Sequence, residues 1–357
     1  MKRTFAEINL KKYCANLDEI KKIINKETKF LAIIKANAYG LGAVPLAYSC
    51  VKSGVDYLGV AWLTEAIELR LNGIEKPILV LSEFFGNYYL ETVGLGITQT
   101  VYTKEFATEL NKAAIKLNTK VKVHVKIDSG MNRIGCKPEE ALELIKYLLT
   151  LNYIELEGLF THFAQADNTS SDYTKKQLVK FCSVIDKLKE ENISVPIIHA
   201  TNSAATLNYP EAHFNMVRLG LATFKDILTL KTFVGFVKTV ETESEISYDG
   251  TFKTKKKTNI ATIMIGYADG LPRSLSNKGR VLIRGNYYPI VGNITMDMTM
   301  IDLGENPDQI RRGDEVVVLG KQGKNEINVF ELARLTNKIP YEIFTGISTI
   351  RVPRIYL

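Results

Sequence analysis

The sequence predicts an α/β fold in which a (β/α)8 barrel of the TIM type precedes a second, mostly β domain. From about residue 28 to 226, short apolar runs alternate with amphipathic stretches of helical period. After about residue 231 the runs become β-rich, and glycine-containing turns separate them. Repeated strand–helix units imply parallel strands joined by right-handed crossovers.

Eight apolar runs supply the predicted barrel strands: Phe30–Ile34, Tyr57–Val60, Pro77–Leu81, Ile97–Val101, Val121–Ile127, Ile154–Phe160, Val195–Ile198 and Asn215–Arg218. Stretches between them, such as Thr64–Leu71 and Pro138–Lys146, repeat apolar residues at helical spacing. Only the stretch between Ser203 and Pro210 is too short for a full helix. Eight units in about 200 residues favour a barrel, although the alternation alone also fits a doubly wound sheet.

The predicted second domain contains five β-rich runs and one helical stretch, Val329–Leu335. The runs are Ile260–Ile265, Arg280–Arg284, Tyr288–Val291, Thr299–Asp302 and Glu315–Leu319. We place the barrel at residues 10–230 and the β domain at 231–357, with residues 1–9 as a further segment that can join it.

The composition is that of an ordinary globular protein, with 46% hydrophobic and 24% charged residues. No apolar segment follows the charged first residues, and no stretch approaches the roughly 18 apolar residues of a membrane span. We therefore expect a cytoplasmic protein without a membrane partner. The cysteines Cys14, Cys50, Cys136 and Cys182 lack CxxC spacing, which speaks against a zinc site or a disulfide framework, and we predict no metal.

A net charge of +7 fits nucleic acid, anionic ligands or no specific partner. The dense run Lys253–Lys257 follows a turn-like stretch and is interpreted as a solvated loop. Elsewhere lysines alternate with glutamates, as in Lys187–Glu191, which is typical of exposed helix faces. No nucleic-acid-binding motif accompanies the charge, so we expect no nucleic-acid partner.

Chemically active side chains gather at the ends of the predicted barrel strands. Lys35, His162, His199 and Arg218 each follow or end a strand, and Arg133 comes after a short turn. Active sites of this fold lie at the carboxyl ends of the strands. The clustering predicts an enzyme.

Lys35 ends an apolar strand, where a lysine is most often a solvated surface residue. Within a barrel mouth, desolvation and cationic neighbours would instead lower its pKa, and the free amine can form a Schiff base with an aldehyde. Tyr39 comes one helical turn later and is expected to point its hydroxyl from the same side.

The run Val121–Ile127 alternates with period two, so its valines share one face while Lys122, His124 and Lys126 share the other. If the valines meet the helices, a polar column points into the barrel. The alternative is a strand that is shielded on one side and solvated on the other. Spacing alone leaves both interpretations open.

Several motifs, in order along nearly the whole chain, resemble those of the alanine racemase family. They are Ile34-Lys-Ala-Asn-Ala-Tyr-Gly40, Lys126-Ile-Asp-Ser-Gly-Met-Asn-Arg133, Thr161-His-Phe-Ala-Gln-Ala-Asp167, His199-Ala-Thr-Asn-Ser203, Ile265-Gly-Tyr-Ala-Asp-Gly270, Met296-Asp297 and Arg351-Val-Pro-Arg354. A single match would be weak, but the lysine signature and the Gly-Tyr-Ala-Asp-Gly signature together are highly specific.

The resemblance implies that Lys35 carries pyridoxal 5'-phosphate and moves the α-proton on one face of the substrate. Tyr267 would act on the opposite face, because racemisation needs two opposed bases. Family members place this tyrosine across a subunit boundary, so the resemblance implies a homodimer. His162 would lie near Tyr267 and the cofactor and would tune the tyrosine.

The resemblance also assigns the other cofactor contacts. Arg218, held by His199, would hydrogen-bond the pyridine nitrogen. The phosphate would be bound by Tyr39, Ser203 and the backbone N–H groups around Gly220 and Leu221, in keeping with the last loops of such barrels.

Arg133 would face the cofactor's phenolic oxygen and the substrate carboxylate, which the Met296 backbone would also contact, with Asp297 in support. Lys126 matches a position that is often carbamylated in the family, where the added carboxylate orients the arginine. An unmodified lysine there would be a like-charge neighbour of Arg133.

Departures from the family pattern lie around the phosphate and the substrate channel. Leu219 and Phe224 stand where a proline and a tyrosine are common, and Ile350 lies where a tyrosine often reaches the phosphate. Thr295 and Asn293 replace residues that are often cysteine and arginine. Both predicted bases are retained.

We therefore predict a pyridoxal-phosphate-dependent alanine racemase that supplies D-alanine for peptidoglycan. Alternatives are a racemase of a larger or broader amino-acid range, such as lysine or serine, and a non-catalytic protein that binds the same cofactor. The second domain with Tyr267 distinguishes the chain from single-domain barrels of the latter kind. Nucleic-acid binding is suggested by charge alone.

Overall fold

The computed structural model describes residues 3–357 and contains two compact units. One comprises residues Cys14–Ala38 and Ala43–Thr223 and is called the barrel unit below. The other, the β unit, comprises the described part of Met1–Tyr13 together with Tyr39–Gly42 and Phe224–Leu357. Each is described by itself.

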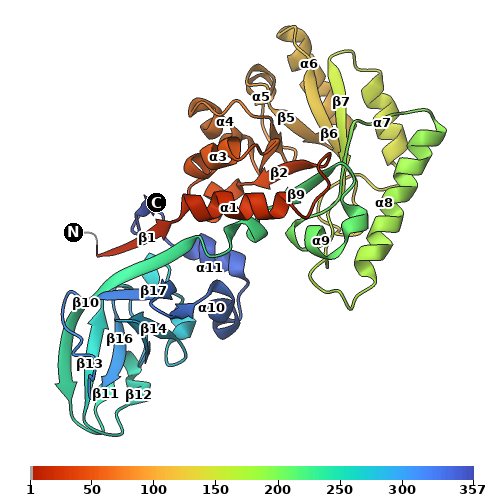
Figure 1. Ribbon diagram of the computed structural model, residues 1–357. Helices are drawn as coiled ribbons and strands as arrows, with labels where there is room; N and C mark the ends of the chain where they lie inside the picture. Colours follow the sequence, from red (N-terminus) through yellow and green to blue (C-terminus); the bar gives the residue numbers. More distant parts are fainter. Residues whose placement is uncertain (1–2) are drawn as a thin grey trace. The chain divides into compact units, whose positions relative to one another are not determined.

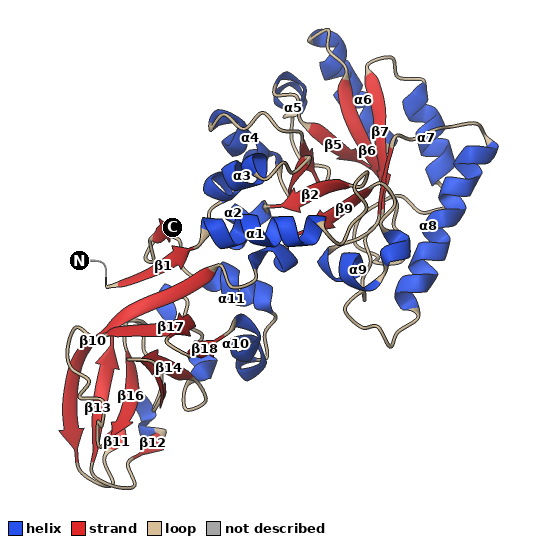
Figure 2. Cartoon of the chain, in the orientation of Figure 1, coloured by secondary structure: helices blue, strands red, loops and turns tan. Residues whose placement is uncertain are grey.

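The barrel unit is built on eight parallel strands in the order β8-β7-β6-β5-β4-β3-β2-β9. Figure 2 shows these strands inside a layer of helices. The strands are β2 (Lys29–Ile33), β3 (Tyr57–Val60), β4 (Ile78–Val80), β5 (Thr98–Val101), β6 (Val121–Lys126), β7 (Ile154–Phe160), β8 (Ile197–His199) and β9 (Met216–Leu219). The predicted barrel and its eight strands are confirmed.

The sheet nearly closes on itself. β2 pairs in parallel with β3 on one side and with β9 on the other. Between β8 and β9, Asn215 N donates to Ile198 O and Arg218 N donates to Thr201 O, each at 3.3 Å. These two hydrogen bonds join β8 and β9, the two ends of the sheet, although the two strands are not paired in a regular ladder.

Helices connect consecutive strands of the barrel unit (Figure 1). They are α3 (Ala43–Lys52), α4 (Leu63–Leu71), α5 (Tyr89–Gly94), α6 (Lys104–Lys116), α7 (Ala141–Leu149), α8 (Tyr173–Glu190) and the short α9 (Ser203–Asn208). α1 (Leu10–Lys21) precedes β2 along the chain. Along the described chain, no helix combines the length and apolar character needed to cross a membrane.

The alternation along β6 separates an apolar face from a polar one. Val121, Val123 and Val125 are buried in one cluster with the inner faces of α6, α7 and α8. His124 and Lys126, on the opposite face, are also buried. The valines therefore meet the helices, and the polar column points into the barrel.

The β unit contains a nine-stranded sheet with the main order β15-β14-β17-β10-β1-β19, to which β13, β16 and β18 add (Figure 1). Its strands are β1 (Thr4–Ile8), β10 (Leu228–Val240), β13 (Thr258–Ile263), β14 (Arg280–Ile283), β15 (Asn286–Pro289), β16 (Thr299–Gly304), β17 (Glu315–Gln322), β18 (Asn325–Ile327) and β19 (Arg354–Tyr356). A separate hairpin pairs β11 (Glu245–Ile246) with β12 (Phe252–Lys253).

Several predictions for this unit need correction. β13 and β15 each begin two residues before the predicted runs Ile260–Ile265 and Tyr288–Val291. Besides α10 (Val329–Thr336), a second helix, α11 (Pro340–Gly346), forms where none was predicted. Its proline occupies the first helical turn, where a missing N–H has no cost. The longest strand, β10, was also missed.

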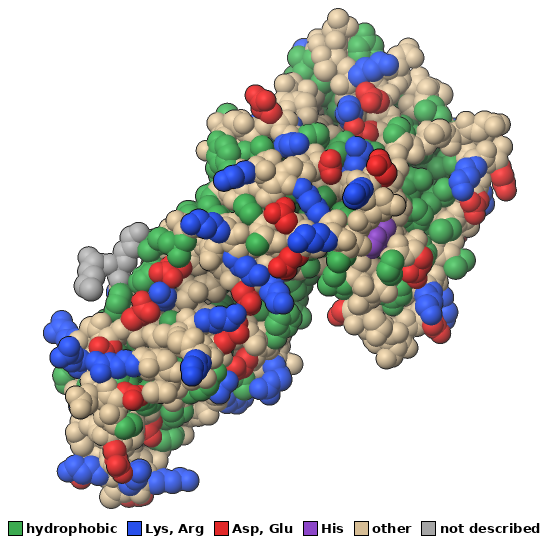
Figure 3. Space-filling view, in the orientation of Figure 1, with side chains coloured by type: hydrophobic (Ala, Val, Ile, Leu, Met, Phe, Trp, Pro, Cys, Tyr) green, Lys and Arg blue, Asp and Glu red, His purple; other side chains and the backbone are tan. Residues whose placement is uncertain are grey.

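The lysine run Lys253–Lys257 lies on the surface and is matched by acidic residues. Lys253, Lys256 and Lys257 lie within 4.0 Å of glutamate oxygens on Glu243, Glu245, Glu305 and Glu241. The face in Figure 3 likewise mixes side chains of both signs. The run is thus part of a mixed, solvated surface.

Candidate active site

The chemically active side chains predicted for the barrel unit meet at the carboxyl ends of its strands. Lys35 follows β2, His162 follows β7, His199 ends β8, Arg218 lies within β9, and Arg133 lies in the loop after β6. This is the end at which barrels of this type carry their active sites. Their mutual hydrogen bonds and electrostatic effects, described below, show that they form one cluster.

Lys35 is half-buried at the end of β2. Burial lowers the pKa of its amine, the charge of Arg133 lowers it further, and Glu65 opposes the change. A lysine in this position holds more free amine near neutral pH than a solvated one.

A left-handed turn follows Lys35. Ala36, Asn37 and Ala38 have φ values of 52°, 52° and 49°, and Tyr39 continues at 57°. Left-handed helical backbone costs roughly 1–2 kcal/mol per residue other than glycine. Two contacts offset this cost: Glu65 Oε1 accepts from Ala36 N at 2.5 Å, and Asn37 Oδ1 accepts from Ala43 N at 2.7 Å.

The expectation that Tyr39 lies one right-handed turn after Lys35 is wrong, because this turn has the opposite hand. Tyr39 is buried in the β unit, where its ring lies 5.0 Å from that of Phe224 and 5.5 Å from that of Tyr341. Which side its hydroxyl serves therefore does not follow from the spacing.

Arg218 is the most buried cation of the cluster. Its Nη1 donates to His199 Nδ1 at 3.0 Å, and its Nη2 donates to the carbonyls of Thr161 and Ala200 at 2.8 and 2.9 Å. Nη2 also lies 3.2 Å from His162 Nδ1. Burial lowers the pKa of Arg218 to about 9, so the guanidinium stays protonated near neutral pH. The predicted contact between Arg218 and His199 is present.

Both histidines beside Arg218 are neutral. Burial and the charge of the arginine hold the pKa of His162 and of His199 well below its usual value. A guanidinium can only donate, so the Nδ1 atom of each ring accepts and the proton lies on Nε2. His162 is thereby left with an Nε2–H donor.

Lys126 lies inside the barrel with 4% of its surface exposed, and its Nζ sits 5.6 Å from the centre of the Phe160 ring. Burial, together with the charges of Arg133 and Arg218, lowers its pKa to about 7. Asp128 opposes this change. The site thus holds an excess of positive charge, which suits an anionic ligand.

Asp128 organises the loop that carries Arg133. Its carboxylate accepts from the backbone N–H groups of Gly130, Asn132 and Arg133 at 2.9, 3.0 and 3.1 Å. Gly135 passes so close that a Cβ there would lie 2.8 Å from Asp128 N. The Arg133 side chain itself is exposed at this mouth.

Ser203, at the start of α9, has a hydroxyl that lies close to two backbone N–H groups. Its Oγ accepts from Gly220 N at 2.9 Å and lies 3.4 Å from Ala222 N. Leu221 lies between these two residues and begins the turn η2 (Leu221–Phe224). A hydroxyl beside several backbone N–H groups is the kind of arrangement that holds a phosphate.

Tyr267 begins a short turn of the β unit, η4 (Tyr267–Asp269), whose geometry is set by Asp269. The buried carboxylate accepts from Gly266 N at 3.1 Å and forms ion pairs with Arg3 and Arg351 at 2.6 and 2.9 Å. Burial works against its charge, but these bonds outweigh burial and lower the pKa of Asp269.

The backbone around Tyr267 is held on both sides. Its N–H donates to Thr295 O, and that of Ala268 donates to Met296 O, each at 3.0 Å. A Cβ on Gly266 would lie 2.3 Å from Thr295 O, and Gly270 has a φ of 102°. The motif thus fixes the backbone while 43% of the Tyr267 surface stays exposed.

Met296 and Asp297 lie beside this turn in the β unit. Met296 is exposed and accepts from Ala268 through its carbonyl. Asp297 forms an ion pair with Arg351, the arginine that also binds Asp269. The predicted residues of the β unit are therefore tied together through Arg351 and the backbone.

The departures from the family pattern have different surroundings. Leu219 and Phe224 are buried, and the Phe224 ring lies 5.9 Å from that of Tyr13. Ile350 is 94% exposed. Asn293 donates from its amide to Tyr248 O at 2.9 Å, so it is engaged in its own unit.

Sequence reasoning passed over several residues that shape the site. Glu65 and Asp128 hold the turns that carry Lys35 and Arg133, and Asp269 sets the turn of Tyr267. Glu157 lies in the middle of a barrel strand and binds His124. A carboxylate inside a run of buried apolar residues is a sequence signal that could have revealed Glu157.

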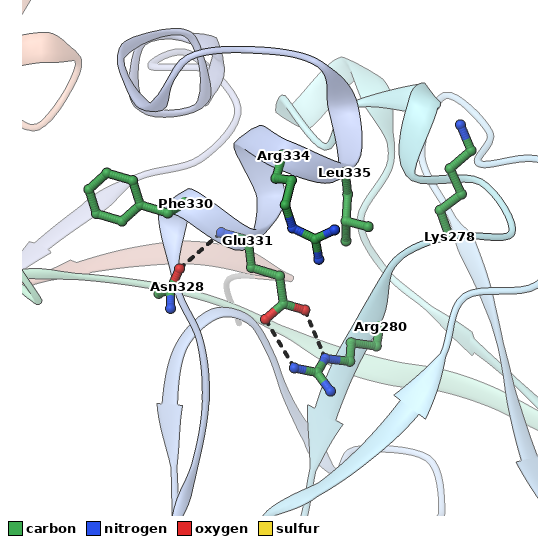
Figure 4. A pocket seen from close by; sticks show the side chains of 7 residues that line it. All are labelled: Lys278, Arg280, Asn328, Phe330, Glu331, Arg334 and Leu335. Atoms are coloured by element: carbon green, nitrogen blue, oxygen red, sulfur yellow. Dashed lines mark hydrogen bonds and ion pairs between the residues drawn. The ribbon is translucent and has the colours of Figure 1, made fainter. Parts of the chain in front are cut away.

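A separate hollow of about 530 Å³ lies in the β unit, around the start of α10 (Figure 4). Glu331 and Arg280 form a two-bond ion pair at 2.8 and 3.0 Å across it, and Asn328 caps the helix. The residues that line it are Lys278, Arg280, Asn328, Phe330, Glu331, Arg334 and Leu335. None of the predicted site residues is among them.

A (β/α)8 barrel with chemically active side chains at the carboxyl ends of its strands defines the class, a barrel enzyme. The alanine racemase N-terminal domain family matches residues 8–227, and the alanine racemase C-terminal domain family matches residues 227–356. The chain therefore belongs to the alanine racemase family, whose members are isomerases.

Individual relatives match over nearly the whole chain. An alanine racemase of Methanococcus maripaludis is 43% identical over 99% of this chain and 98% of its own. The alanine racemase structure of Clostridium difficile is 42% identical, with a TM-score of 0.92 over 99% of this chain and 96% of that one.

Two solved relatives carry bound molecules. The alanine racemase of Bacillus anthracis with bound L-Ala-P is 37% identical, with a TM-score of 0.91 over 100% of this chain and 95% of that one. The enzyme of Bartonella henselae with covalently bound pyridoxal phosphate is 28% identical, with a TM-score of 0.90 over 100% of both chains.

Proposed function

We propose that this racemase interconverts L- and D-alanine with pyridoxal 5'-phosphate as cofactor and with Lys35 and Tyr267 as opposed bases. The observation that carries the proposal is Lys35 itself, half-buried at the end of β2 with a lowered pKa among cations. A free amine is what covalent attachment of an aldehyde requires. The covalently bound cofactor of the Bartonella henselae enzyme supports the proposal.

The residues present fit this cofactor. Its phosphate and phenolic oxygen are anionic, and the barrel mouth holds Lys35, Lys126, Arg133 and Arg218, whose charges act on one another. In our proposal Ser203, Tyr39 and the N–H groups of Gly220 and Leu221 hold the phosphate, which would replace Ser203 Oγ as the acceptor of the Gly220 N–H. When bound, the cofactor supplies the electron sink that makes an amino acid's α-proton acidic.

Arg218 would direct a guanidinium N–H to the pyridine nitrogen. Its bonds to His199 and to the Thr161 and Ala200 carbonyls fix the plane of its head group. Near neutral pH, below its pKa of about 9, the Arg218 guanidinium keeps its proton, so the ring nitrogen would stay unprotonated. Arg218 would thereby weaken the electron sink and disfavour transamination.

The two bases act on opposite faces of the substrate. Lys35 Nζ would remove or return the α-proton on one face, and Tyr267 Oη would do so on the other. His162, whose Nε2–H is free of Arg218, would hydrogen-bond and tune Tyr267. The exposed Tyr267 side chain on a rigid turn supports its use by a second subunit, so we propose a homodimer.

Arg133 and the Met296 backbone would bind the substrate carboxylate, with Asp297 in support. We further propose that Lys126 is carbamylated. With a pKa of about 7, much of this lysine is free amine at neutral pH. The amine adds to CO2 to give a carbamate and releases one proton, and the new negative charge would pair with Arg133.

The test is a racemisation assay of purified protein with L-alanine, L-serine and L-lysine, after its absorbance spectrum has been recorded. We expect a yellow protein that racemises alanine fastest. Lys35→Ala should abolish both the cofactor absorbance and racemisation, whereas Lys52→Ala, on the exposed side of α3, should change neither.

A fully active Lys35→Ala variant would refute the proposal. Faster turnover of serine or lysine would instead favour the racemase of a larger amino acid, and a yellow but inactive wild type would favour a cofactor-binding protein. The supply of D-alanine to peptidoglycan and a cytoplasmic location stay predictions.

A further inference from the structure

Inside the barrel, a chain of hydrogen bonds runs from Arg218 on β9 through His199 on β8 and His124 on β6 to Glu157 on β7. Arg218 Nη1 lies 3.0 Å from His199 Nδ1, His199 Nε2 lies 2.8 Å from His124 Nδ1, and His124 Nε2 lies 3.1 Å from Glu157 Oε2. All four residues are buried. Glu157 Oε1 accepts from Lys122 Nζ at 2.7 Å, which ends the chain of hydrogen bonds near solvent.

When the histidines are neutral, the donors and acceptors along this chain of hydrogen bonds can be arranged in only one order. Arg218 can only donate, so His199 accepts at Nδ1 and carries its proton on Nε2. His124 must then accept at Nδ1 and donate from Nε2, and Glu157 can accept as a carboxylate. We infer that Glu157 is the terminal acceptor of this one-directional chain and thereby a positioning residue for Arg218.

The protonation states agree with this direction. Burial lowers the pKa of His124, and burial with the charge of Arg218 lowers that of His199. For Glu157, burial opposes the charge, but hydrogen bonds from His124 and Lys122 outweigh burial and lower its pKa to about 2. The chain thus joins a buried cation to a carboxylate through two neutral rings.

Two local features of β7 build the chain. Val123 pairs with Leu156 and His124 pairs with Gly158, so Glu157 is an extra residue in a β-bulge. A bulge turns a side chain that would face the helices toward the other face of the sheet. At Gly158 a Cβ would lie 2.4 Å from His124 Nδ1, so only glycine lets histidines from β6 and β8 meet across β7.

Phe160, Tyr57 and Glu155 also lie near the chain of hydrogen bonds, and none of these three is hydrogen-bonded to a ring nitrogen of His199. The Phe160 ring stacks on His199, with centroids 4.6 Å apart and planes 9° apart. Tyr57 lies 6.3 Å from His124, and burial and Glu157 raise the pKa of the Tyr57 hydroxyl. Glu155, the other nearby carboxylate, reaches only Lys122, at 4.0 Å.

The inference is tested first by 15N NMR of purified, histidine-labelled protein. The chain has four histidines. His213 serves as the reference because its Nε2 must donate to Thr206 O. We expect His124 and His199 to show a protonated Nε2 and a bare Nδ1 from about pH 6 to about pH 8, which is below the pKa of Arg218. A protonated Nδ1 on either ring would overturn the chain, and this readout needs no variant.

The second test compares Glu157→Gln with Glu155→Gln. Because Arg218 still fixes the direction of the chain, Glu157→Gln should leave the His124 proton on Nε2. The charged acceptor becomes a neutral amide oxygen, so the hydrogen bond weakens and the 15N signal of His124 Nε2 shifts. Because the effect on catalysis rests on the proposed function, we expect kcat to fall on the order of tenfold while KM for alanine changes little. Glu155→Gln should change neither.

If Glu157→Gln matched Glu155→Gln in the 15N signal of His124 Nε2 and in kcat, the positioning role would be wrong. A wild type that does not racemise alanine would refute the proposed function, while the 15N spectra would still decide whether the chain of hydrogen bonds exists. The two failures are therefore distinguishable.

Discussion

At the scale of single residues, the site is dominated by cations that are kept from water. Lys35, Lys126 and Arg218 all have lowered pKa values, and burial is the first cause in each case. Each charge therefore destabilises the folded protein unless an anion neutralises it. Carbamylation of Lys126 and binding of a phosphate would both relieve this cost.

Lys126 should give a measurable pH dependence of stability in CO2-free buffer. Its pKa is about 7 in the folded protein and about 10.5 when unfolded. Between these values the unfolded chain keeps a proton that the folded chain has lost, so the free energy of unfolding rises with pH. Below about pH 7 both states are protonated and the full cost remains.

Urea denaturation checks this prediction from about pH 6 to about pH 10, a range that is set by the two pKa values. Lys126→Met should remove the contribution of Lys126 to the rise of the free energy of unfolding with pH. The variant should therefore be more stable than wild type at low pH, and this difference in the free energy of unfolding should shrink as the pH rises. Bicarbonate should stabilise wild type but not the variant. Equal slopes for the two proteins would contradict the lowered pKa.

At the scale of elements, the left-handed turn after Lys35 stores strain at the point where the cofactor is proposed to attach. Ala36 is exposed and has a φ of 52°. Glycine adopts this conformation without the clash that Cβ causes. The turn is held in place by Glu65 and Ala43 instead of by its own preference.

Ala36→Gly should therefore leave the free energy of unfolding unchanged or raise it, by up to about 1 kcal/mol. Ala15→Gly is the matched control, because Ala15 is exposed in the right-handed helix α1. It should lower the free energy of unfolding by about 1 kcal/mol. Equal losses in the two variants, measured by chemical denaturation, would show that Ala36 is not strained.

Elements were predictable where one physical pattern governs them. β3 coincides with its predicted run because a buried parallel strand is a continuous apolar segment. β7 coincides as well, although Glu155 and Glu157 lie within it. β10 was missed although buried and partly exposed residues alternate over residues 228–234, so its period-two pattern was present in the sequence and was not recognised. The left-handed turn could not be foreseen, since Ala-Asn-Ala-Tyr has no residue that requires that conformation.

The candidate site was predictable to a similar extent. The carboxyl-end rule alone located Lys35, His162, His199 and Arg218. It could not locate Glu157, because this residue lies within β7 and not at its carboxyl end. The bulge that places Glu157 beside His124 is a register shift between two strands, and one strand's sequence does not show it. Tyr267 carries no signal of its own in the residues, and its proposed role came from the family resemblance.

At the scale of the whole molecule, the homodimer proposal makes a quantitative prediction. Lys35→Ala and Tyr267→Ala should each be inactive alone. If each site combines Lys35 of one subunit with Tyr267 of the other, a mixed dimer of the two variants regains one intact site. Unfolding and refolding the variants together in equal amounts should then restore about a quarter of wild-type activity.

The control is the same treatment of each variant by itself, which should stay inactive. A mixture that also stays inactive, although mixed dimers are shown to form by mass spectrometry, would place both bases in one chain. That outcome would contradict the shared site while leaving the racemase proposal intact.

The β unit is assembled from distant parts of the chain, and this has a consequence for synthesis on the ribosome. β1 pairs with β19, Arg354 donates to Gly40 O at 2.9 Å, and Tyr356 donates to Leu41 O at 3.2 Å. The segment just after Lys35 therefore finds its partners 314 and 315 residues later in the chain. Although domains usually fold as they emerge, a nascent chain should stay inactive, and open to proteolysis, until Arg354 and Tyr356 have been translated.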